Sequence, residues 1–540
     1  MQITKFNFLL LLAGVALLWA AIFFGKSFLE TYLLSDGNAG QITLTKLHLL
    51  RIVSAIIGLS VCSYAILNIK GSPKVKRINE VFRSWFIDRP LAKRYWSLLI
   101  LLLLIKSVSL TIANYAYWKE HLGWEYLWVA QGISAGHGFS VNEPRRWGFV
   151  DHEDNNKYSK DKYFPTAIEE PVYPYLLALS YKLFGDYGKL TIFLHIVVFL
   201  FSVIILNSLG QKAFDLETGL LAGCLLIFWP GVNSQVRYLA PAMLGGFFII
   251  AEALLILLCL RKPSIRRGIT LGLVLGVSSL TLGATLLFIP LSAFLVFLSI
   301  RPINKTVWAT SAAIIITPCI VMSPWVIRNY NIFGEFIPTR IGLGFIAHQA
   351  NPILAGTFYP GVHTCTDTIG PMWKAGSASE AVKLAREGND RAGEIYRRSY
   401  ACIEEQAPEG YEKFNEAQRD KVYLEKSKEF IFSHPGVFAK LVIYKFRAYF
   451  FGTTWQHTIS VILAAIGVAL VLFYRRRLEI MALILMILSF SAPYGVTMPW
   501  FYRYRYPIEP LILLFTSYAV VIFVKKITVL VGFVDFWPET

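Results

Sequence analysis

The chain has 540 residues, of which 55% are hydrophobic and only 16% are charged, and its net charge is +17. Ordinary soluble domains carry about 25% charged residues, so this composition excludes a soluble globular protein. The basic residues lie in short loops between apolar segments. That pattern is typical of membrane proteins and argues against nucleic acid as a partner.

The apolar residues are gathered in segments of about 17–22 residues, each long enough to cross roughly 30 Å of hydrocarbon as a helix. We therefore predict an all-α polytopic membrane protein with about twelve transmembrane helices. The first segment is long for a signal peptide and no clear cleavage site follows it, so we expect it to remain as a helix. The predicted spans are residues 8–24, 50–69, 96–116, 190–208, 216–233, 240–260, 268–282, 284–300, 308–327, 458–474, 479–497 and 507–524.

Two long loops interrupt the predicted spans, at about residues 117–189 and 328–457. Five loops rich in Lys and Arg, of which residues 70–95 form the longest, fall on one side of the membrane if every span is real. The positive-inside rule assigns that side to the cytoplasm and leaves the two long loops outside. We expect them to form a small mixed helical cap, with residues 434–451 lying along the membrane surface because basic residues interrupt their apolar pattern.

The chain thus divides into four predicted parts, which differ in their relation to the membrane. They are two N-terminal transmembrane helices with a basic cytoplasmic loop (1–95), a transmembrane core with the first outer loop (96–327), an extracytoplasmic cap with an interfacial helix (328–457), and the C-terminal transmembrane helices (458–540).

Few ionisable residues lie within the predicted spans. Lys106 and Glu252 each fall near the middle of one. Burying a charge at that depth is costly, so we favour an ion pair that holds two helices together over a polar functional site. In the second long loop, Cys365 and Cys402 would form a disulfide if the loop is extracytoplasmic, with two free thiols as the equal alternative.

Several short motifs occur in a fixed order along the chain. The first outer loop contains WEY at 124–126, GHGF at 136–139 and EEPVYPY at 169–175. Later motifs are SPWVIRNY at 323–330 with FGEFIP at 333–338, a helical pattern from Asp420 to Arg447, and YRYRYP at 502–507. This layout resembles the GT-C superfamily of glycosyltransferases, in the group of the protein O-mannosyltransferases and the lipid A aminoarabinose transferase. The resemblance implies a GT-C-like bundle and an inverting transfer from a polyprenyl-phosphate carrier.

Glycosyl transfer needs a carboxylate that takes a proton from the acceptor hydroxyl, and positive charge that stabilises the leaving phosphate. Acidic residues of the first outer loop meet the first need, with Glu125 as first candidate and Asp151, Asp154 and Glu170 behind it. The resemblance also implies a base in this loop. However, the family's leading Asp falls at Leu122 here, so the identity of the base stays open, and loss of catalysis is an alternative.

Basic residues at the outer ends of spans meet the second need, because an Arg side chain binds phosphate oxygens through two donors at once. The candidates for the donor phosphate are Arg328, Arg503 and Arg505. The structural alternative for the last two is that they anchor lipid headgroups within an aromatic belt. The candidates for other substrate contacts are Tyr126, His137, Tyr173, Asn329 and Tyr330.

These observations predict a membrane glycosyltransferase that moves a sugar from a polyprenyl-phosphate donor to a glycan, lipid or protein acceptor outside the cytoplasm. The alternatives are a polysaccharide polymerase or ligase with a diphosphate-linked donor, and a transporter or flippase. By analogy with bacterial relatives, we expect a multi-pass protein of the bacterial inner membrane that acts in cell-envelope glycan biosynthesis. We expect no metal site and no cofactor; a divalent cation is left open without support.

Overall fold

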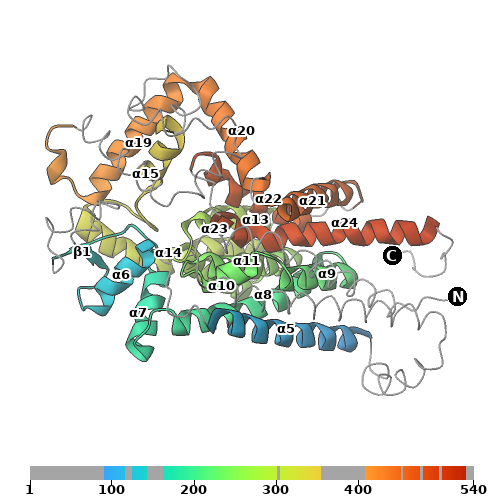
Figure 1. Cartoon of the computed structure of the whole chain (residues 1–540). Coiled ribbons are helices and arrows are strands. Elements are labelled where there is room, and N and C mark those ends of the chain that lie inside the picture. The colour runs from blue at the N-terminus through green and yellow to red at the C-terminus, as the bar shows by residue number, and fades with distance from the viewer. Residues whose placement is uncertain are drawn as a thin grey trace.

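The computed structural model describes residues 91–115, 124–142, 162–300, 304–353, 408–451, 454–474, 478–497 and 502–530. Within these ranges the chain is helical apart from loops and one small sheet (Figure 1). Predicted features that lie outside the described residues are the spans at 8–24 and 50–69, the acids Asp151 and Asp154, and the cysteines Cys365 and Cys402.

Every predicted span that falls within the described residues coincides with a helix. These helices are α5 (Leu91–Tyr115), α8 (Lys189–Ala213), α9 (Leu216–Ile227), α11 (Ala242–Arg261), α12 (Ile265–Ser279), α13 (Phe288–Leu298), α14 (Lys305–Phe333), α21 (Trp455–Tyr474), α22 (Leu478–Ser491) and α24 (Glu509–Leu530). Among the described residues, 6 helical stretches are long and apolar enough to cross a membrane. The chain is therefore an integral membrane protein, while the expected total of about twelve spans stays a prediction.

Capping side chains define where several of these helices begin. Asp215 accepts a hydrogen bond of 2.9 Å from the Thr218 N–H and so caps α9. Asn304 does the same for α14 through the Val307 N–H at 3.0 Å. Such caps satisfy backbone N–H groups that have no partner inside the helix. At its other end α14 stops at Gly334, whose φ of 70° suits a residue without a Cβ.

Helices α12 and α14 pack closely because α12 presents a stripe of glycines to its neighbour. A Cβ at Gly268 would lie 2.7 Å from the backbone oxygen of Thr310, and a Cβ at Gly272 or Gly276 would lie 2.7 Å from a side-chain carbon of α14. Small residues at this four-residue spacing allow two membrane helices to approach closely enough for their backbones to pack. This contact fixes α14 against the bundle, and α14 in turn carries Arg328.

The remaining elements include α19 and α20, which project from one end of the bundle (Figure 1). They are α6 (Trp124–Ser134), β1 (Ser140–Asn142), β2 (Tyr163–Pro165), α7 (Val172–Phe184), α10 (Val232–Arg237), η3 (Gly283–Leu287), α15 (Leu343–His348), η4 (Gln349–Ile353), η6 (Tyr411–Lys413), α19 (Glu416–Ser433), α20 (Pro435–Phe451), η7 (Ala492–Gly495), α23 (Tyr502–Arg505) and η8 (Tyr506–Ile508). The strands are antiparallel, with Val141 opposite Phe164. The segment predicted as an interfacial helix is α20, while its position on the membrane and the role of this region as a cap stay predictions.

The predicted ion pair between Lys106 and Glu252 is wrong. Lys106 on α5 instead donates from Nζ to Asn233 Oδ1 on α10 at 2.9 Å. Both carboxylate oxygens of Glu252 lack a hydrogen-bond partner among the described residues. The hydroxyl of Ser278, a neighbour of Glu252 on α12, donates to Thr285 at 2.9 Å. Equal depth along two helices does not make two side chains face one another, and here α10 supplies the acceptor for Lys106.

Candidate functional site

The centre of the candidate site is the stretch of chain between β2 and α7, called here the 166–172 segment. It is held by elements that are distant in sequence. The Ile341 N–H donates to the carbonyl of Ala167 at 2.7 Å, and the Val172 N–H donates to the carbonyl of Leu280 at 3.1 Å. Side chains of α14 and α19 also bind this segment. A loop with this many backbone partners has a defined conformation and presents its side chains rigidly.

Arg328, near the end of α14, connects that helix to the residue before β1 and to the residue after β2. Its Nη1 donates to the carbonyl of Thr166 at 2.7 Å, and its Nη2 donates to the carbonyl of Phe139 at 2.7 Å. The guanidinium carbon lies 5.0 Å from the ring centre of Trp325, a distance suited to a cation–π contact. Both terminal nitrogens thus bind backbone carbonyls, which gives Arg328 a positioning role. Its predicted contact with a donor phosphate stays a prediction.

The start of α19 provides the second attachment of the 166–172 segment. The carboxylate of Glu416 accepts from the Thr166 hydroxyl at 2.7 Å and from the Ala167 N–H at 3.1 Å. Glu416 occupies the first turn of α19, where a negative charge is also stabilised by the helix dipole. The helical region after residue 408 is therefore bonded directly to the loop between α5 and α7.

Two acidic residues of the segment lie beside an arginine. Nη1 of Arg340 is 2.7 Å from Glu169 Oε2 and 3.9 Å from Glu170 Oε2. The two carboxylates are about as buried as core residues, with side chains 4% exposed, whereas that of Arg340 is 26% exposed. Burial lowers the pKa of the Arg340 guanidinium, but the two carboxylates more than offset this, so its pKa lies well above the ordinary value.

The two oxygens of Glu170 differ in their surroundings. Oε1 accepts a hydrogen bond of 2.8 Å from the Gly283 N–H at the start of η3. Oε2 is buried and receives no hydrogen bond within the described part of the chain. A Cβ at residue 283 would lie 2.8 Å from Oε1, so glycine gives the carboxylate room to reach this N–H. A fixed carboxylate that has one oxygen without a described hydrogen bond, beside a cation, has the chemistry to accept a proton from a ligand hydroxyl.

Arg340 is placed by two side chains of α14. The Trp325 Nε1–H donates to the carbonyl of Thr339 at 2.6 Å, and Asn329 Nδ2 donates to the carbonyl of Ile337 at 3.1 Å. Asn329 is fully buried and serves this turn, while Tyr330 beside it is 60% exposed. The predicted substrate contacts of Asn329 and Tyr330 are untested; the geometry shows Asn329 as a support for the loop that carries Arg340.

Glu125 and Tyr126 lie in the first turn of α6. Glu125 is half-buried, and its carboxylate has no partner among the residues that the structure describes. Tyr126 is buried, and its ring lies 5.4 Å from that of Tyr173. The Tyr173 hydroxyl lies 3.2 Å from Nε2 of His195, inside the bundle. Glu125 is therefore not committed to a partner within the described residues, whereas Tyr173 packs as a core residue.

His137 lies in the turn before β1. It is exposed, and its ring stacks on Tyr163 with the ring centres 4.0 Å apart. The glycines on either side, Gly136 and Gly138, have φ values of 86° and 68°, which L side chains rarely adopt. The conformation of the GHGF motif is thus set by its glycines, and His137 projects from it.

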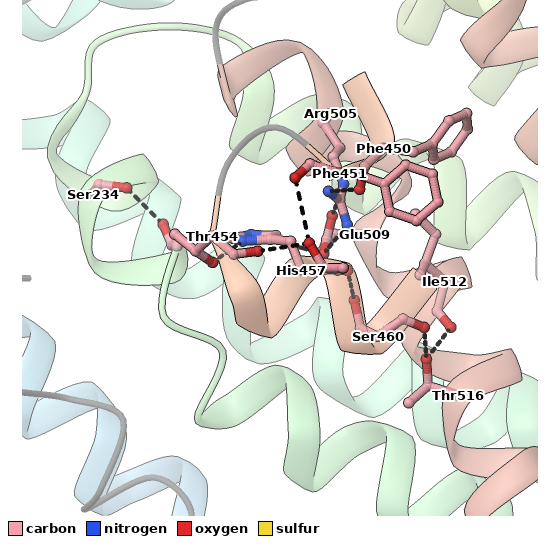
Figure 2. Close-up of polar contacts among 12 residues, drawn as sticks. Ser234, Phe450, Phe451, Thr454, His457, Ser460, Arg505, Glu509, Ile512 and Thr516 are labelled. Atoms are coloured by element: carbon pink, nitrogen blue, oxygen red, sulfur yellow. Dashed lines mark hydrogen bonds and ion pairs between the residues drawn. The ribbon is translucent and has the colours of Figure 1, made fainter. Parts of the chain in front are cut away.

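Arg505 forms a buried cluster within the bundle (Figure 2). Its Nε lies 2.9 Å from Glu509 Oε2, its Nη2 donates to Glu509 Oε1 at 3.1 Å, and its Nη1 donates to the carbonyl of Phe450 at 2.7 Å. The side chains of Arg505 and Glu509 are 1% and 0% exposed. His457 lies beside them, with Nε2 3.9 Å from Glu509 Oε1. The predicted phosphate contact of Arg505 stays a prediction, and the side chain of Arg503 is not described.

Sequence reasoning missed three of the charged residues that build these clusters: Arg340, Glu416 and Glu509. Glu509 was detectable, because it follows Arg505 by four residues and such pairs meet on a helix. Arg340 lies two residues after the FGEFIP motif, but nothing in its spacing indicates a partner at residue 169. Among the described residues, no three His, Cys, Asp or Glu side chains gather as a metal site would require.

Residues 167–327 match the protein family described as dolichyl-phosphate-mannose-protein mannosyltransferase. The match begins inside the 166–172 segment and ends immediately before Arg328. It confirms, for this part of the chain, the resemblance to GT-C glycosyltransferases that the motifs predict. No curated protein sequence shows a significant match to the chain.

Several solved structures resemble the chain at low sequence identity. The apo form of the Archaeoglobus fulgidus oligosaccharyltransferase is 13% identical with a TM-score of 0.49, over 82% of this chain and 52% of that one. The archaeal oligosaccharyltransferase AglB from Archaeoglobus fulgidus, in complex with an inhibitory peptide and a dolichol-phosphate, is 11% identical with a TM-score of 0.46, over 83% of this chain and 52% of that one. ArnT from Cupriavidus metallidurans bound to undecaprenyl phosphate is 12% identical with a TM-score of 0.34, over 79% of this chain and 78% of that one. The chain spans about half of the length of the archaeal enzyme.

Proposed function

We propose that the protein is a membrane glycosyltransferase that takes a sugar from a polyprenyl-phosphate carrier and transfers it, with inversion, to an acceptor outside the cytoplasm. The acceptor is a glycan, a lipid or a protein, and the membrane is the bacterial inner membrane. The observation that carries this proposal is the position of Glu169 and Glu170. They lie in the part of the chain that matches the mannosyltransferase family, rigidly held and beside Arg340.

The reaction requires a base for the acceptor hydroxyl, and two carboxylates are suited to that role. Glu170 lies within the matched residues and has one oxygen without a hydrogen bond among the described residues. Glu125, the first candidate from the sequence, lies outside the match but is partly accessible. We place Glu170 first because it lies within the matched residues and is held by the Gly283 N–H beside Arg340.

The leaving phosphate requires cations, and the structure describes the side chains of two of the three predicted candidates, Arg328 and Arg505. Arg328 donates to two backbone carbonyls, and Arg505 is engaged by Glu509. Those two would contact a phosphate only by exchanging bonds that the protein already makes. Because these two are engaged, we propose the third predicted candidate, Arg503, as the phosphate contact and assign Arg328 and Arg505 to the surrounding structure, with direct phosphate contacts by Arg328 and Arg505 as the alternative.

Sugar transfer in proteoliposomes tests these roles. Radiolabelled polyprenyl-phosphate sugars and a panel of acceptors would be supplied to wild type, Glu170→Gln, Glu125→Gln and the control Glu425→Gln, whose carboxylate is exposed on α19. We expect Glu170→Gln to lose about 100-fold or more in rate, as removal of a general base does, while the control keeps its rate. Full activity of Glu170→Gln with loss in Glu125→Gln would move the base to Glu125. Full activity of both would contradict a carboxylate base in this loop.

A further inference from the structure

Arg340 faces two carboxylates that are adjacent in sequence. Its Nη1 lies 2.7 Å from Glu169 Oε2 and 3.9 Å from Glu170 Oε2, and both acidic side chains are only 4% exposed. Two like charges so close together, and so far from water, repel strongly unless a cation lies beside them. Among the described residues, Arg340 is placed to compensate the charge of this pair.

Among the described residues, the other groups that face the cluster come from three helical elements and from the loop that carries Arg340. The phenols of Tyr126 on α6 and Tyr504 on α23 lie close enough to interact with the charge of Arg340. The Gly283 N–H at the start of η3 donates to Glu170, and the Thr339 hydroxyl lies beside the same glycine. Phenols, hydroxyls and backbone amides are neutral near pH 7, so Arg340 brings positive charge to this described part of the cluster.

The position of Arg340 is itself fixed. The Trp325 Nε1–H on α14 donates a hydrogen bond to the carbonyl of Thr339, and the Ile341 N–H donates one to the carbonyl of Ala167. The residues on both sides of Arg340 are thus bonded, one to the long helix and the other to the segment that bears the acids. Such support is what a residue needs if it is to hold a partner group within a fraction of an ångström.

We propose that Arg340 is a positioning residue for sugar transfer, which compensates the charges of Glu169 and Glu170 and holds the Glu170 carboxylate in place for the acceptor. This rests on the proposed function and assigns the base to Glu170. In the step, the Glu170 carboxylate takes the hydroxyl proton of the acceptor, and the acceptor oxygen bonds to the anomeric carbon. The bond from that carbon to the phosphate oxygen breaks, and its electron pair leaves with the polyprenyl phosphate.

The pH dependence of kcat/KM distinguishes this role from plain structural support. The variants are Arg340→Gln, Arg340→Lys and the double variant Glu169→Gln/Arg340→Gln, which removes the cation together with one carboxylate. The acid limb of the profile is the range in which kcat/KM falls as the pH is lowered. In Arg340→Gln this limb should move to higher pH by about one unit or more, because a carboxylate pair that has lost a cation holds its proton more tightly. Arg340→Lys should stay close to wild type, and the double variant should move back toward it.

Arg328→Gln provides the comparison, because it removes a neighbouring guanidinium that binds carbonyls instead of carboxylates. It should lower activity without moving the acid limb. If Arg340→Gln lowers activity equally at every pH and leaves the acid limb unchanged, the proposal is overturned. An acid limb that moves equally in Arg328→Gln would overturn it as well.

Thermal unfolding of the full-length protein in detergent supplies a readout that does not depend on activity. If the two acids are left without their cation, Arg340→Gln should lower the midpoint more at pH 8 than at pH 5, because protonation at pH 5 relieves the repulsion. Equal losses at both pH values would contradict the role of Arg340. If wild type transfers no sugar from any lipid-phosphate donor, the proposed function fails. The losses in the unfolding midpoint at pH 8 and pH 5 still test whether Arg340 compensates the charges of the pair.

Discussion

The side chains of Arg505 and Glu509 form an ion pair of 2.9 Å in the interior of the bundle, one helical turn apart (Figure 2). Arg505 also donates to the carbonyl of Phe450 at the end of α20, so the pair connects α20 to the start of α24. Removing one partner of a buried pair leaves the other charge without compensation, which costs roughly 3–5 kcal/mol. We expect Glu509→Gln to lower the thermal midpoint sharply, as measured by tryptophan fluorescence in detergent.

The double variant Arg505→Met/Glu509→Leu is the control for that prediction, because it removes both charges together. Replacing a buried pair by apolar residues is often close to neutral in stability. The double variant should therefore be more stable than Glu509→Gln. If the single variant is as stable as wild type, the pair does not hold these helices together.

Arg328→Lys should weaken the attachment of α14 to the loop between α5 and α7. A lysine keeps the charge but loses the planar arrangement of donors that reaches Thr166 and Phe139 at once. We expect limited proteolysis to cut the loop around β1 and β2 faster in the variant, with transfer activity reduced at every pH. The exposed Arg447 on α20 offers a matched control, and Arg447→Lys should be cut at the wild-type rate. Unchanged proteolysis in Arg328→Lys would contradict its positioning role.

Gly344 marks a close approach between α15 and α19. A Cβ at this residue would overlap the backbone oxygen of Asp420, whose carboxylate also accepts from the Gly344 and Phe345 N–H groups. Gly344→Ala should therefore destabilise the protein by about 1–3 kcal/mol, as overpacking does. Gly436 on α20 has open space around its Cβ position, so Gly436→Ala should be neutral or slightly stabilising. Equal thermal midpoints for the two variants would contradict the contact.

Lys445 on α20 should make stability depend on pH. Its Nζ is buried and donates to Asn351 Oδ1 at 2.7 Å and to the carbonyl of Gly495 at 3.1 Å, and burial lowers the pKa of Lys445 to about 7. An unfolded lysine keeps its proton up to about pH 10.5, so between these values the unfolded chain binds more protons and the free energy of unfolding rises with pH.

The slope contributed by Lys445 should approach ~1.4 kcal/mol per pH unit above pH 7 and vanish below it. Unfolding of wild type and Lys445→Met at pH 6, 7, 8 and 9 would show it, because the variant should lack the rise. Lys440→Met, which changes an exposed lysine of the same helix, should keep the wild-type slope. Parallel pH profiles for wild type and Lys445→Met would contradict the lowered pKa.

The sequence was sufficient to predict the helices, because the length and composition of an apolar segment determine whether it can span a bilayer. Every predicted span within the described residues coincides with a helix. The pairing of helices was not predictable in the same way. Lys106 and Glu252 have similar depths, but their directions around the helix axes differ, and single-sequence patterns do not record how two helices are rotated.

The site was only partly predictable for the same reason. The motifs placed Glu170 and Arg328 near the reaction because of their residue types and order. The partners of Arg328, however, are backbone carbonyls, which any residue type supplies and which therefore leave no trace in the sequence. Arg340 pairs with Glu169 across 171 residues of chain, and its partner is fixed by the packing of α14 against the 166–172 segment.

Donor-class competition with the wild-type protein tests the dependence on a lipid phosphate most directly. Proteoliposomes would receive polyprenyl-phosphate and polyprenyl-diphosphate sugars of the same chain length, and both the glycosylated acceptor and the released lipid would be quantified. We expect product only from the monophosphate donor, one polyprenyl phosphate released for each sugar transferred, and inversion at the anomeric carbon. Product formed only from the diphosphate donor, or retention at that carbon, would contradict the proposed reaction.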